Sequence, residues 1–334
     1  MTDLNSVPII PLLERAIQLR ESMFDSSHRT AFRLFNGFIE GEPEICIDLY
    51  AKSFLLHNYA NPPERGSERV NQVLLYLKER FPWIKAVVVK ERYGVSSERK
   101  SGFLIFGEKA DRKIWENGIW YSIDLCMNRD ASLYLDTRLL REWISKNLKD
   151  KTVLNTFAYT GSLGVAAMGA GAKQVCHIEQ NRKFLNLAKE SYSLNGFPIK
   201  KSDFMEGDFW GKVSHLKNKG THFDTVILDP PFFATSEQGT VDLVQNAKQV
   251  INKVRPLVEN EGYLIVINNA LFLSGKEFMN EIESLCQDGY LKVESIIPIS
   301  SDYAGFLETV SASVTDPSPF NHSTKIIVLR VKRK

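Results

Sequence analysis

The side chains best suited to chemistry stand between Thr225 and Phe233, in the order Thr-Val-Ile-Leu-Asp-Pro-Pro-Phe-Phe. An apolar run there ends in the carboxylate Asp229, and two prolines and two aromatic residues follow it. Proline has no amide N–H, so the turn keeps free carbonyl acceptors and a stiff backbone. A rigid acceptor edge beside an aromatic surface suits a flat ring such as a nucleobase. Asp229, Pro230 and Phe232 are therefore the predicted reaction centre, and a turn that only ends a strand is the alternative.

A second stretch, Val153 to Gly164, combines an apolar run, a turn of small residues and an Ala- and Gly-rich segment. Such a turn lets a ligand approach the backbone amides at the start of a helix. About 20 residues further on, another apolar run ends in Glu179, at the spacing where a carboxylate meets ribose hydroxyls. This unit predicts a nucleoside site, and plain packing of a helix on a sheet is the alternative.

The turn lacks the GxGxxG pattern that a dinucleotide with its phosphates requires. S-adenosylmethionine carries no phosphate and tolerates a bulkier turn, so the sequence favours this methyl donor over a nicotinamide. Asp208 is predicted to accept a hydrogen bond from the adenine amino group, with Phe209 beside the ring, unless it is a solvated loop residue. Together these features predict the following cofactor-binding residues: Phe157, Tyr159, Thr160, Gly161, Glu179, Asp208 and Phe209.

A parallel sheet is needed to bring these residues together, and the pattern after Ile114 predicts one, because short β-rich runs alternate with longer helical segments. The predicted strands are Val153–Phe157, Gln174–Glu179, Ser202–Glu206, Thr225–Asp229, Tyr263–Asn268, Val293–Ile299 and Lys325–Val331, the last two as an antiparallel hairpin. The predicted helices are Arg182–Leu194, Val241–Val254 and Lys276–Leu285.

The amino-terminal third predicts a separate, small α+β domain, since 334 residues exceed one ordinary core. Its predicted elements are a helix at Leu12–Met23 and strands at Ile45–Leu49, Phe54–Asn58 and Ala86–Val89. The predicted domains are residues 1–115, for substrate docking, and residues 116–334, for cofactor binding and catalysis.

Composition excludes several classes of protein. Hydrophobic residues make up 43% and charged residues 25%, the balance of a globular chain. The longest apolar runs are far shorter than the ~20 residues of a membrane span. Four scattered cysteines without a CxxC pair predict neither disulfides nor zinc and suit a cytoplasmic protein, and no metal-ligand spacing appears.

Two basic clusters are candidates for contact with phosphates, although solvated surface is the alternative for both. The net charge of +2 does not by itself imply a nucleic-acid partner. The clusters are Lys90, Arg92, Arg99 and Lys100 around Tyr93, and Arg330, Lys332, Arg333 and Lys334 at the carboxyl end.

The region from about Glu116 onward resembles the bacterial large-subunit ribosomal RNA methyltransferases, the family that includes the 23S cytosine-5 enzymes. The resemblance covers about two thirds of the chain. It is carried by Glu116-Asn117-Gly118, Leu133-Tyr134-Leu135-Asp136-Thr137-Arg138, Asn155 with Phe157, Tyr159-Thr160-Gly161, Gly171-Ala172, Asp229-Pro230-Pro231-Phe232 and Asn321-His322-Ser323-Thr324-Lys325.

The resemblance implies a Rossmann-like, seven-stranded class I methyltransferase sheet behind a smaller α+β domain. It also implies that Asp136, Arg138 and Asn155 lie near the cofactor, and that Asp229 lies at the reaction centre. The implied partner is RNA, and ribosomal RNA above all. The oligomeric state stays open, a homodimer included.

One departure from that family concerns the target atom. Cytosine-5 methylation needs a thiolate that adds to the ring. The resemblance implies that the family's cytosine enzymes carry such a cysteine after the fifth strand, where this chain reads Val266-Ile267-Asn268-Asn269-Ala270. The other position known for this cysteine lies directly after the two prolines, and this chain has Phe232 there. Cys126 is interpreted as inert core. Transfer to a base nitrogen needs no adduct, so nitrogen and carbon both stay open. Methylation of a small molecule or protein, and cofactor or RNA binding without catalysis, are the alternative functions.

Overall fold

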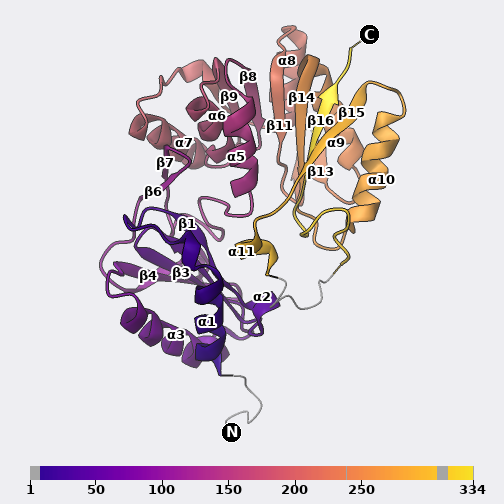
Figure 1. Ribbon diagram of the computed structural model, residues 1–334. Coiled ribbons are helices and arrows are strands. Elements are labelled where there is room, and N and C mark those ends of the chain that lie inside the picture. Colours follow the sequence, from indigo (N-terminus) through magenta and orange to yellow (C-terminus); the bar gives the residue numbers. More distant parts are fainter. Residues whose placement is uncertain (1–7, 238, 307–314, 334) are drawn as a thin grey trace. The chain divides into compact units, whose positions relative to one another are not determined.

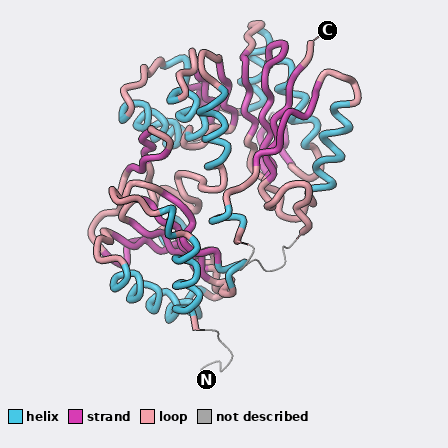
Figure 2. The backbone as a smooth tube through the Cα atoms, viewed as in Figure 1, coloured by secondary structure: helices cyan, strands magenta, loops and turns pink. Residues whose placement is uncertain are grey.

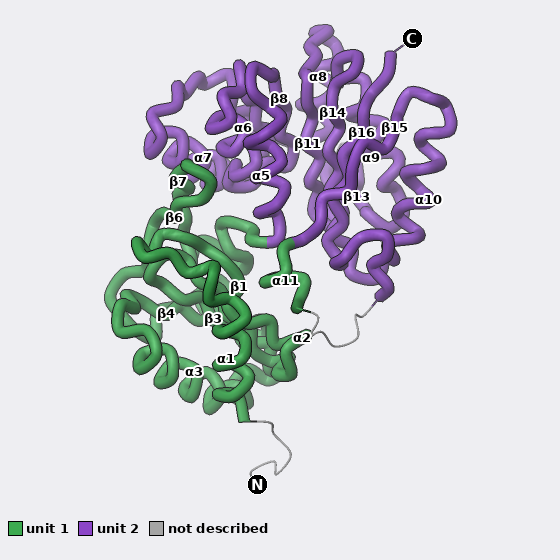
Figure 3. The backbone as a smooth tube through the Cα atoms, viewed as in Figure 1, with its two compact units in different colours: residues 1–135, 300–312 green, residues 136–299, 313–334 purple. Residues whose placement is uncertain are grey.

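The computed structural model describes residues 8–237, 239–306 and 315–333. The backbone divides into two compact units, and Figure 3 colours them separately. Unit 1 comprises residues 1–135 and 300–312, and unit 2 comprises residues 136–299 and 313–334. Within the described ranges, no helix is both long enough and apolar enough to cross a membrane.

Unit 2 contains a seven-stranded sheet in the order β10-β9-β8-β11-β14-β16-β15 (Figure 1). Its strands are β8 (Thr152–Thr156), β9 (Gln174–Glu179), β10 (Phe204–Glu206), β11 (Phe223–Leu228), β14 (Val258–Asn268), β15 (Leu291–Ile297) and β16 (Lys325–Val331). The first five pair in parallel, and β16 runs antiparallel to both of its neighbours. The order turns outward in both directions from β8 and β11, which makes this pair the switch point where open α/β sheets bind ligands.

Helices cover both faces of this sheet, as the cyan coils around the magenta strands of unit 2 show (Figure 2). One group consists of α5 (Arg138–Asn147), α6 (Ser162–Gly169) and α7 (Arg182–Leu194), and the other of α8 (Phe209–Asn218), α9 (Ala247–Val254) and α10 (Gly275–Cys286). The second group forms one apolar core with the strands, which includes Trp210, Val250 and Phe278. A small hairpin, β12 (Phe233–Ser236) with β13 (Gly239–Asp242), follows the Asp-Pro-Pro turn.

Unit 1 contains a five-stranded sheet in the order β1-β2-β3-β4-β5, with its own core. Its elements are β1 (Ala31–Asn36), β2 (Ile45–Tyr50), β3 (Ser53–Asn58), β4 (Ala86–Glu91), β5 (Phe103–Phe106), the hairpin β6 (Lys113–Glu116) with β7 (Ile119–Ser122), and helices α1 (Ile9–Leu19), α2 (Gly37–Glu40), α3 (Ser67–Arg80), α4 (Ser97–Ser101) and α11 (Ser301–Ala304). Only β3 and β4 are parallel, and α3 connects them.

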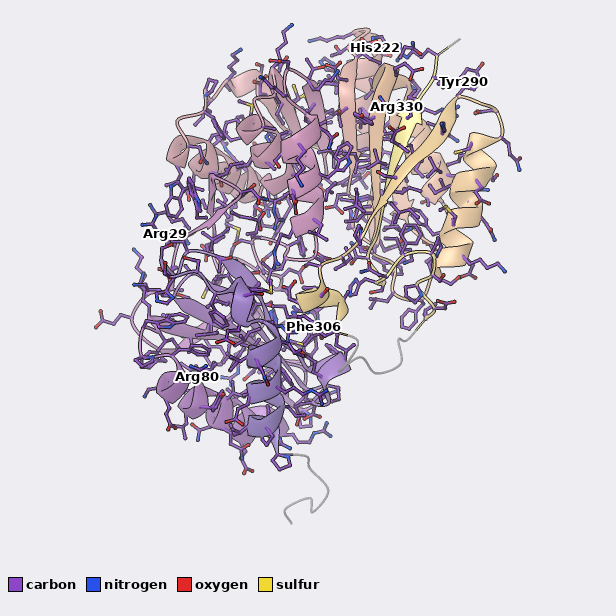
Figure 4. All side chains as sticks on the ribbon, viewed as in Figure 1. Arg29, Arg80, His222, Tyr290, Phe306 and Arg330 are labelled. Atoms are coloured by element: carbon purple, nitrogen blue, oxygen red, sulfur yellow. The ribbon has the colours of Figure 1, made fainter. Side chains whose placement is uncertain are left out.

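The border between the units falls between Leu135 and Asp136, later than the predicted border after residue 115. The reason is hydrogen bonding within unit 1: Trp115 N donates to the carbonyl of Arg29 at 2.8 Å, which ties the β6–β7 hairpin to β1. Residues 300–306 belong to unit 1, where the carboxylate of Asp302 accepts a hydrogen bond from Arg33 N on β1 at 2.9 Å. In Figure 4, Phe306 lies directly after α11, and the guanidinium of Arg20 lies over its ring at 4.9 Å.

One predicted helix begins later than expected. Val241–Val254 was predicted to be helical throughout, but Val241 belongs to β13 and the helix starts at Ala247. Asp242 accepts hydrogen bonds through Oδ1 from Val244 N and Gln245 N, a local turn that competes with a helix. At the amino terminus, the helix covers Ile9–Leu19 instead of Leu12–Met23, with Pro11 tolerated in its first turn.

Candidate cofactor and acceptor site

The predicted site residues Phe157, Glu179 and Asp229 lie at the carboxyl ends of the neighbouring parallel strands β8, β9 and β11. The register pairs Thr156 of β8 with Ile178 of β9 and with Leu228 of β11, so the turn after Thr156 lies level with Glu179 and Asp229. Because parallel strands end at one edge, the turn and both carboxylates belong to the same side of the sheet. The strand order therefore places the turn and both carboxylates at the switch point.

The turn after β8 has an unusual backbone. Phe157, Tyr159 and Gly161 all have positive φ angles, of 50°, 51° and 76°. Such angles are costly for residues other than glycine and persist only where neighbours enforce them. Here Ala158 N donates to the carbonyl of Ile178 at 2.9 Å, and Gly161 N donates to the carbonyl of Ala158 at 2.8 Å. The turn is thus held in a shape that follows the edge of the sheet.

Glu179 is the carboxylate that closes this turn. Its Oε2 accepts from Tyr159 N at 2.8 Å and its Oε1 accepts from Asn181 N at 2.8 Å. A carboxylate has about four lone-pair sites, so each oxygen keeps one for a further donor. Two adjacent acceptors at a strand end match the paired hydroxyls of a ribose.

The helix after the turn packs unusually close to β9. A Cβ placed on Gly164 would stand 2.3 Å from Cε1 of His177, which is fully buried, and one on Gly161 would stand 2.6 Å from Cβ of Ala188. Both glycines are therefore required by close packing, and Gly161 by its φ angle as well. Burial lowers the pKa of His177 to about 3, so this imidazole is neutral.

We expect Gly164→Ala to destabilise unit 2 by about 1–3 kcal/mol, because the added methyl group overpacks the α6–β9 contact. Urea unfolding of both proteins measures this difference. Gly169→Ala is the matched control, since Gly169 is exposed, lies at the end of the same helix and has no positive φ angle. Equal stability of Gly164→Ala and wild type would contradict the close contact.

Two of the predicted cofactor residues, Asn155 and Phe209, are buried. Asn155 is 1% exposed, and its Nδ2 lies 3.4 Å from Nδ1 of His177. Phe209 is 4% exposed and stacks on Phe157 with ring centroids 4.4 Å apart. The strand alternation turns Asn155 inward, and Phe209 belongs to the apolar core against which Phe157 packs.

Asp208 caps the helix α8. Its Oδ1 accepts from Trp210 N at 2.9 Å and from Gly211 N at 3.2 Å, which satisfies two free amides of the first turn. Oδ2 is therefore the oxygen that would accept the predicted hydrogen bond from an adenine amino group. Thr160, 4% exposed, lies inside the turn, and Arg138 is the first residue of α5.

Asp229 follows β11 beside a second carboxylate. Burial, and then the charge of Asp136, raise the pKa of Asp229 to about 7. Asp136 is held by Thr324, whose Oγ1 donates to Oδ2 of Asp136 at 2.9 Å. This contact brings one residue of the Asn321–Lys325 stretch into the site. A carboxyl group with a pKa near neutrality is suited to exchanging a proton with a substrate.

Exposed aromatic side chains follow Asp229. Phe232 is 48% exposed and Phe233 is 57% exposed, although large apolar side chains are usually buried. The carbonyl of Phe232 accepts from Leu243 N at 3.1 Å, and the carbonyl of Leu243 accepts from Nδ2 of Asn268 at 3.3 Å. These bonds connect the aromatic turn to the end of β14. An apolar surface at this edge is suited to a flat ligand.

The end of β14 and the start of β16 contribute polar groups to which the sequence analysis gave no role in the site. Lys325 is fully buried, and its Nζ donates to the carbonyls of Ala270 at 2.9 Å and Ser323 at 2.6 Å. Burial lowers the pKa of Lys325 to about 8. Oδ1 of Asn269 is buried and has no hydrogen-bond partner within the described ranges. The signal was present in the sequence, where two asparagines end an apolar strand.

The carboxyl-terminal basic cluster lies at the opposite end of the sheet. Arg330 pairs in register with Tyr263 of β14, which lies level with Thr225 near the start of β11, and its guanidinium contacts Glu294 at 2.7 Å and the Tyr263 ring at 4.1 Å. Figure 4 shows Arg330 at the same end of unit 2 as His222, which precedes β11. This cluster therefore does not serve the site at Asp229, and Lys334 lies outside the described residues.

A comparison with protein families matches residues 83–290 to the model described as S-adenosylmethionine-dependent methyltransferase. The chain belongs to this family. The predicted cofactor, S-adenosylmethionine, is confirmed. The residues of the site fit it, because Glu179 offers free acceptors for the ribose and the turn contains no phosphate-binding pattern.

Named relatives agree with the family assignment and with the predicted resemblance. The methyltransferase is 29% identical over 292 residues to the ribosomal RNA large subunit methyltransferase I of Aliivibrio fischeri, covering 85% of this chain and 72% of the relative. It is 32% identical over 244 residues to the protein of that name from Vibrio vulnificus, covering 70% and 60%.

A solved structure confirms the predicted fold. The methyltransferase SMU.776, complexed with SAH, matches 99% of this chain and 83% of its own length with a TM-score of 0.84 and 22% identity. The seven-stranded class I methyltransferase sheet with helices on both faces is thus the fold of unit 2. Within the described ranges, no group of His, Cys, Asp or Glu side chains could hold a metal ion.

Proposed function

We propose that this methyltransferase modifies a base of ribosomal RNA, at a nitrogen atom. The observation that carries the proposal is the edge formed by Asp229 and Phe232, a carboxyl group with a pKa near 7 beside an aromatic ring that is 48% exposed. A flat base that stacks on the ring presents its nitrogen edge to the carboxylate. The relatives named as ribosomal RNA large subunit methyltransferases support RNA as the class of substrate.

Each group at the edge has a separate task in this proposal. S-adenosylmethionine, when bound, supplies an electrophilic methyl group on a sulfonium. Glu179 holds the ribose side of the site, and the turn from Phe157 to Gly161 lines it. Pro230 and Pro231 stiffen the backbone between Asp229 and Phe232, and the Phe232 ring orients the base. Asp229 accepts the hydrogen of the nitrogen as it is methylated, and its pKa near 7 lets it do so at physiological pH.

The cysteines favour nitrogen over carbon as the target. Cys176 and Cys286 are the two cysteines of unit 2, and neither follows a strand at the edge that carries Asp229: Cys176 lies within β9 and Cys286 ends α10. Burial raises the pKa of Cys176 to about 12, so this thiol does not form a thiolate near neutral pH. Transfer to nitrogen needs alignment instead of a covalent adduct.

Cys126 is exposed and follows β7 in unit 1, so the prediction that it belongs to an apolar core was wrong. Partial burial nevertheless raises its pKa, which disfavours the thiolate. We expect Cys126→Ala to change the rate of RNA methylation by less than about twofold, measured with radiolabelled cofactor on ribosomal RNA from cells without the gene. Loss of turnover, with folding and cofactor affinity unchanged, would show that a thiolate adduct forms.

The experiment that tests the proposed function is mass spectrometry of ribosomal RNA nucleosides from cells with and without the gene. A methylated nucleoside that disappears with the gene, with its methyl group on nitrogen, is the expected result. A methyl group on carbon would overturn the assignment of the atom, and an unchanged nucleoside profile would overturn ribosomal RNA as the substrate. A ribosomal substrate would agree with the cytoplasmic location predicted from the cysteines, which stays a prediction.

A further inference from the structure

Unit 1 has a small cavity, partly open to solvent, that the proposed reaction does not use. Four cationic side chains and two rings line it: Lys90, Arg92, Lys100, Arg129, His57 and Tyr59. Its enclosed space is about that of one water molecule, so an anion would meet these side chains at the open mouth of the cavity. Part of the amino-terminal basic cluster predicted from the sequence thus surrounds a defined space.

The fold places this cavity where parallel strands end. His57 of β3 pairs in register with Lys90 of β4, and these two strands are the parallel pair of the sheet. Tyr59 and Arg92 follow directly, and Arg92 N donates to the carbonyl of Asn58 at 2.9 Å. The carboxyl ends of parallel strands are where open sheets collect ligand-binding groups.

Lys90 is the buried cation of the cavity. It is 2% exposed, and its Nζ donates to the carbonyls of Asn128 at 2.6 Å and Asp130 at 2.9 Å. An ammonium group has three donors, so one remains after these two bonds. Burial lowers the pKa of Lys90 to about 8, because neutral carbonyls replace its water without cancelling its charge. An anion in the cavity would supply that missing charge.

The carboxylates near the cavity already have cationic partners. Asp48 contacts Arg33 at 2.8 Å and His57 at 3.1 Å. Burial lowers the pKa of His57, and this effect is larger than the opposite effect of the Asp48 carboxylate. Glu91 binds Arg99 at 2.5 Å, and Asp130 lies 3.4 Å from Arg92. Lys90, Lys100 and Arg129 have no ion pair with a carboxylate among the contacts of the described residues. The cavity therefore carries an excess of positive charge.

We propose that this cavity binds a phosphate of the RNA backbone. The inference rests on the proposed function for its ligand, since a phosphodiester is the anion that an RNA substrate brings. Tyr93, 52% exposed and adjacent to Arg92, offers a ring on which a neighbouring base stacks. The site positions the substrate and takes no part in methyl transfer.

The test compares two double variants of the full chain with equal loss of charge. Lys100→Gln with Arg129→Gln removes two cations from the cavity and leaves the buried Lys90 in place. Lys52→Gln with Lys109→Gln is the control, because both residues are exposed, belong to unit 1 and do not line the cavity. The probe is a labelled single-stranded oligouridine of roughly 12 nucleotides, a typical site length for such binding.

We expect the cavity variant to bind the oligouridine about 10-fold more weakly than the control variant. The slope of log affinity against log salt should fall by about 0.7, the value for one lost phosphate on a single strand. Equal affinities of the two double variants would overturn the proposal. Inorganic phosphate at millimolar concentration is the second probe: competition with the oligouridine only at such concentrations supports a backbone site, and tight phosphate binding that leaves RNA binding unchanged overturns it.

Failure of this inference is distinguishable from failure of the proposed function. If wild type methylates ribosomal RNA and the cavity variant binds and methylates like the control, only the cavity proposal fails. If the cavity variant binds RNA more weakly than the control variant, as expected, but no ribosomal nucleoside depends on the gene, only the proposed substrate fails.

Discussion

Replacing Asp229 with asparagine is expected to lower kcat for RNA methylation by about 10²–10⁴-fold while raising the melting temperature at pH 8. The loss follows because asparagine cannot take a proton from the base. The gain in stability follows because the charge of Asp229 is disfavoured by burial and by Asp136, which together raise its pKa from 3.8 to about 7. Stability and activity therefore change in opposite directions.

The pH dependence of this effect has a definite sign. The folded protein holds a proton on Asp229 up to about pH 7, whereas the unfolded chain releases it near pH 4. The group's contribution to stability is thus fully present below about pH 4 and is lost as the pH rises to 7. In contrast, kcat of the wild type should rise through pH 7, because only the ionised carboxylate accepts a proton.

Thermal unfolding at pH 5 and pH 8, with single-turnover rates over the same range, measures both effects. Glu283→Gln is the control, since it makes the same change from carboxylate to amide at an exposed position of α10. A near-normal kcat for Asp229→Asn would show that the carboxylate is not needed. A lowered melting temperature at pH 8 would show that Asp229 has a stabilising partner.

Glu179→Gln is expected to weaken binding of S-adenosylmethionine by about 10- to 100-fold, with a smaller effect on folding. Glutamine keeps one acceptor for Tyr159 N, so the turn after β8 is retained, but it loses the charge and the second acceptor. A hydrogen bond to a charged group contributes about 1.5–3 kcal/mol, which corresponds to this change in Kd.

Isothermal titration with the cofactor measures this change without any RNA. The control is Glu206→Gln, because Glu206 is the register partner of Glu179 on β10 and its side chain is exposed. Unchanged affinity of Glu179→Gln would place the ribose elsewhere along the edge. No measurable binding by the wild type would contradict the assignment of the whole site.

Sequence patterns alone located two strands of the sheet, Gln174–Glu179 and Lys325–Val331, and the helix Arg182–Leu194 with the bounds that the structure has. Periodicity and helix caps are local, so a single chain reveals them. The patterns did not reveal β1 or α3, and they extended a helix through Val241, whose strand exists only because Ala234 pairs with it. Pairing partners are remote in sequence, so propensity cannot decide them.

The sequence by itself determined the chemical content of the site: an acid after each of two apolar strands, a turn of small residues and an Asp-Pro-Pro turn with aromatics. Only the tertiary structure decided which groups face a ligand. It turned Asn155 and Phe209 inward, brought Thr324 to Asp136, moved Arg330 to the far end of the sheet and gathered Lys90, Lys100 and Arg129 around a cavity. The reason is physical, because exposure and pKa depend on neighbours that strand order and helix packing supply, and no local stretch of sequence contains them.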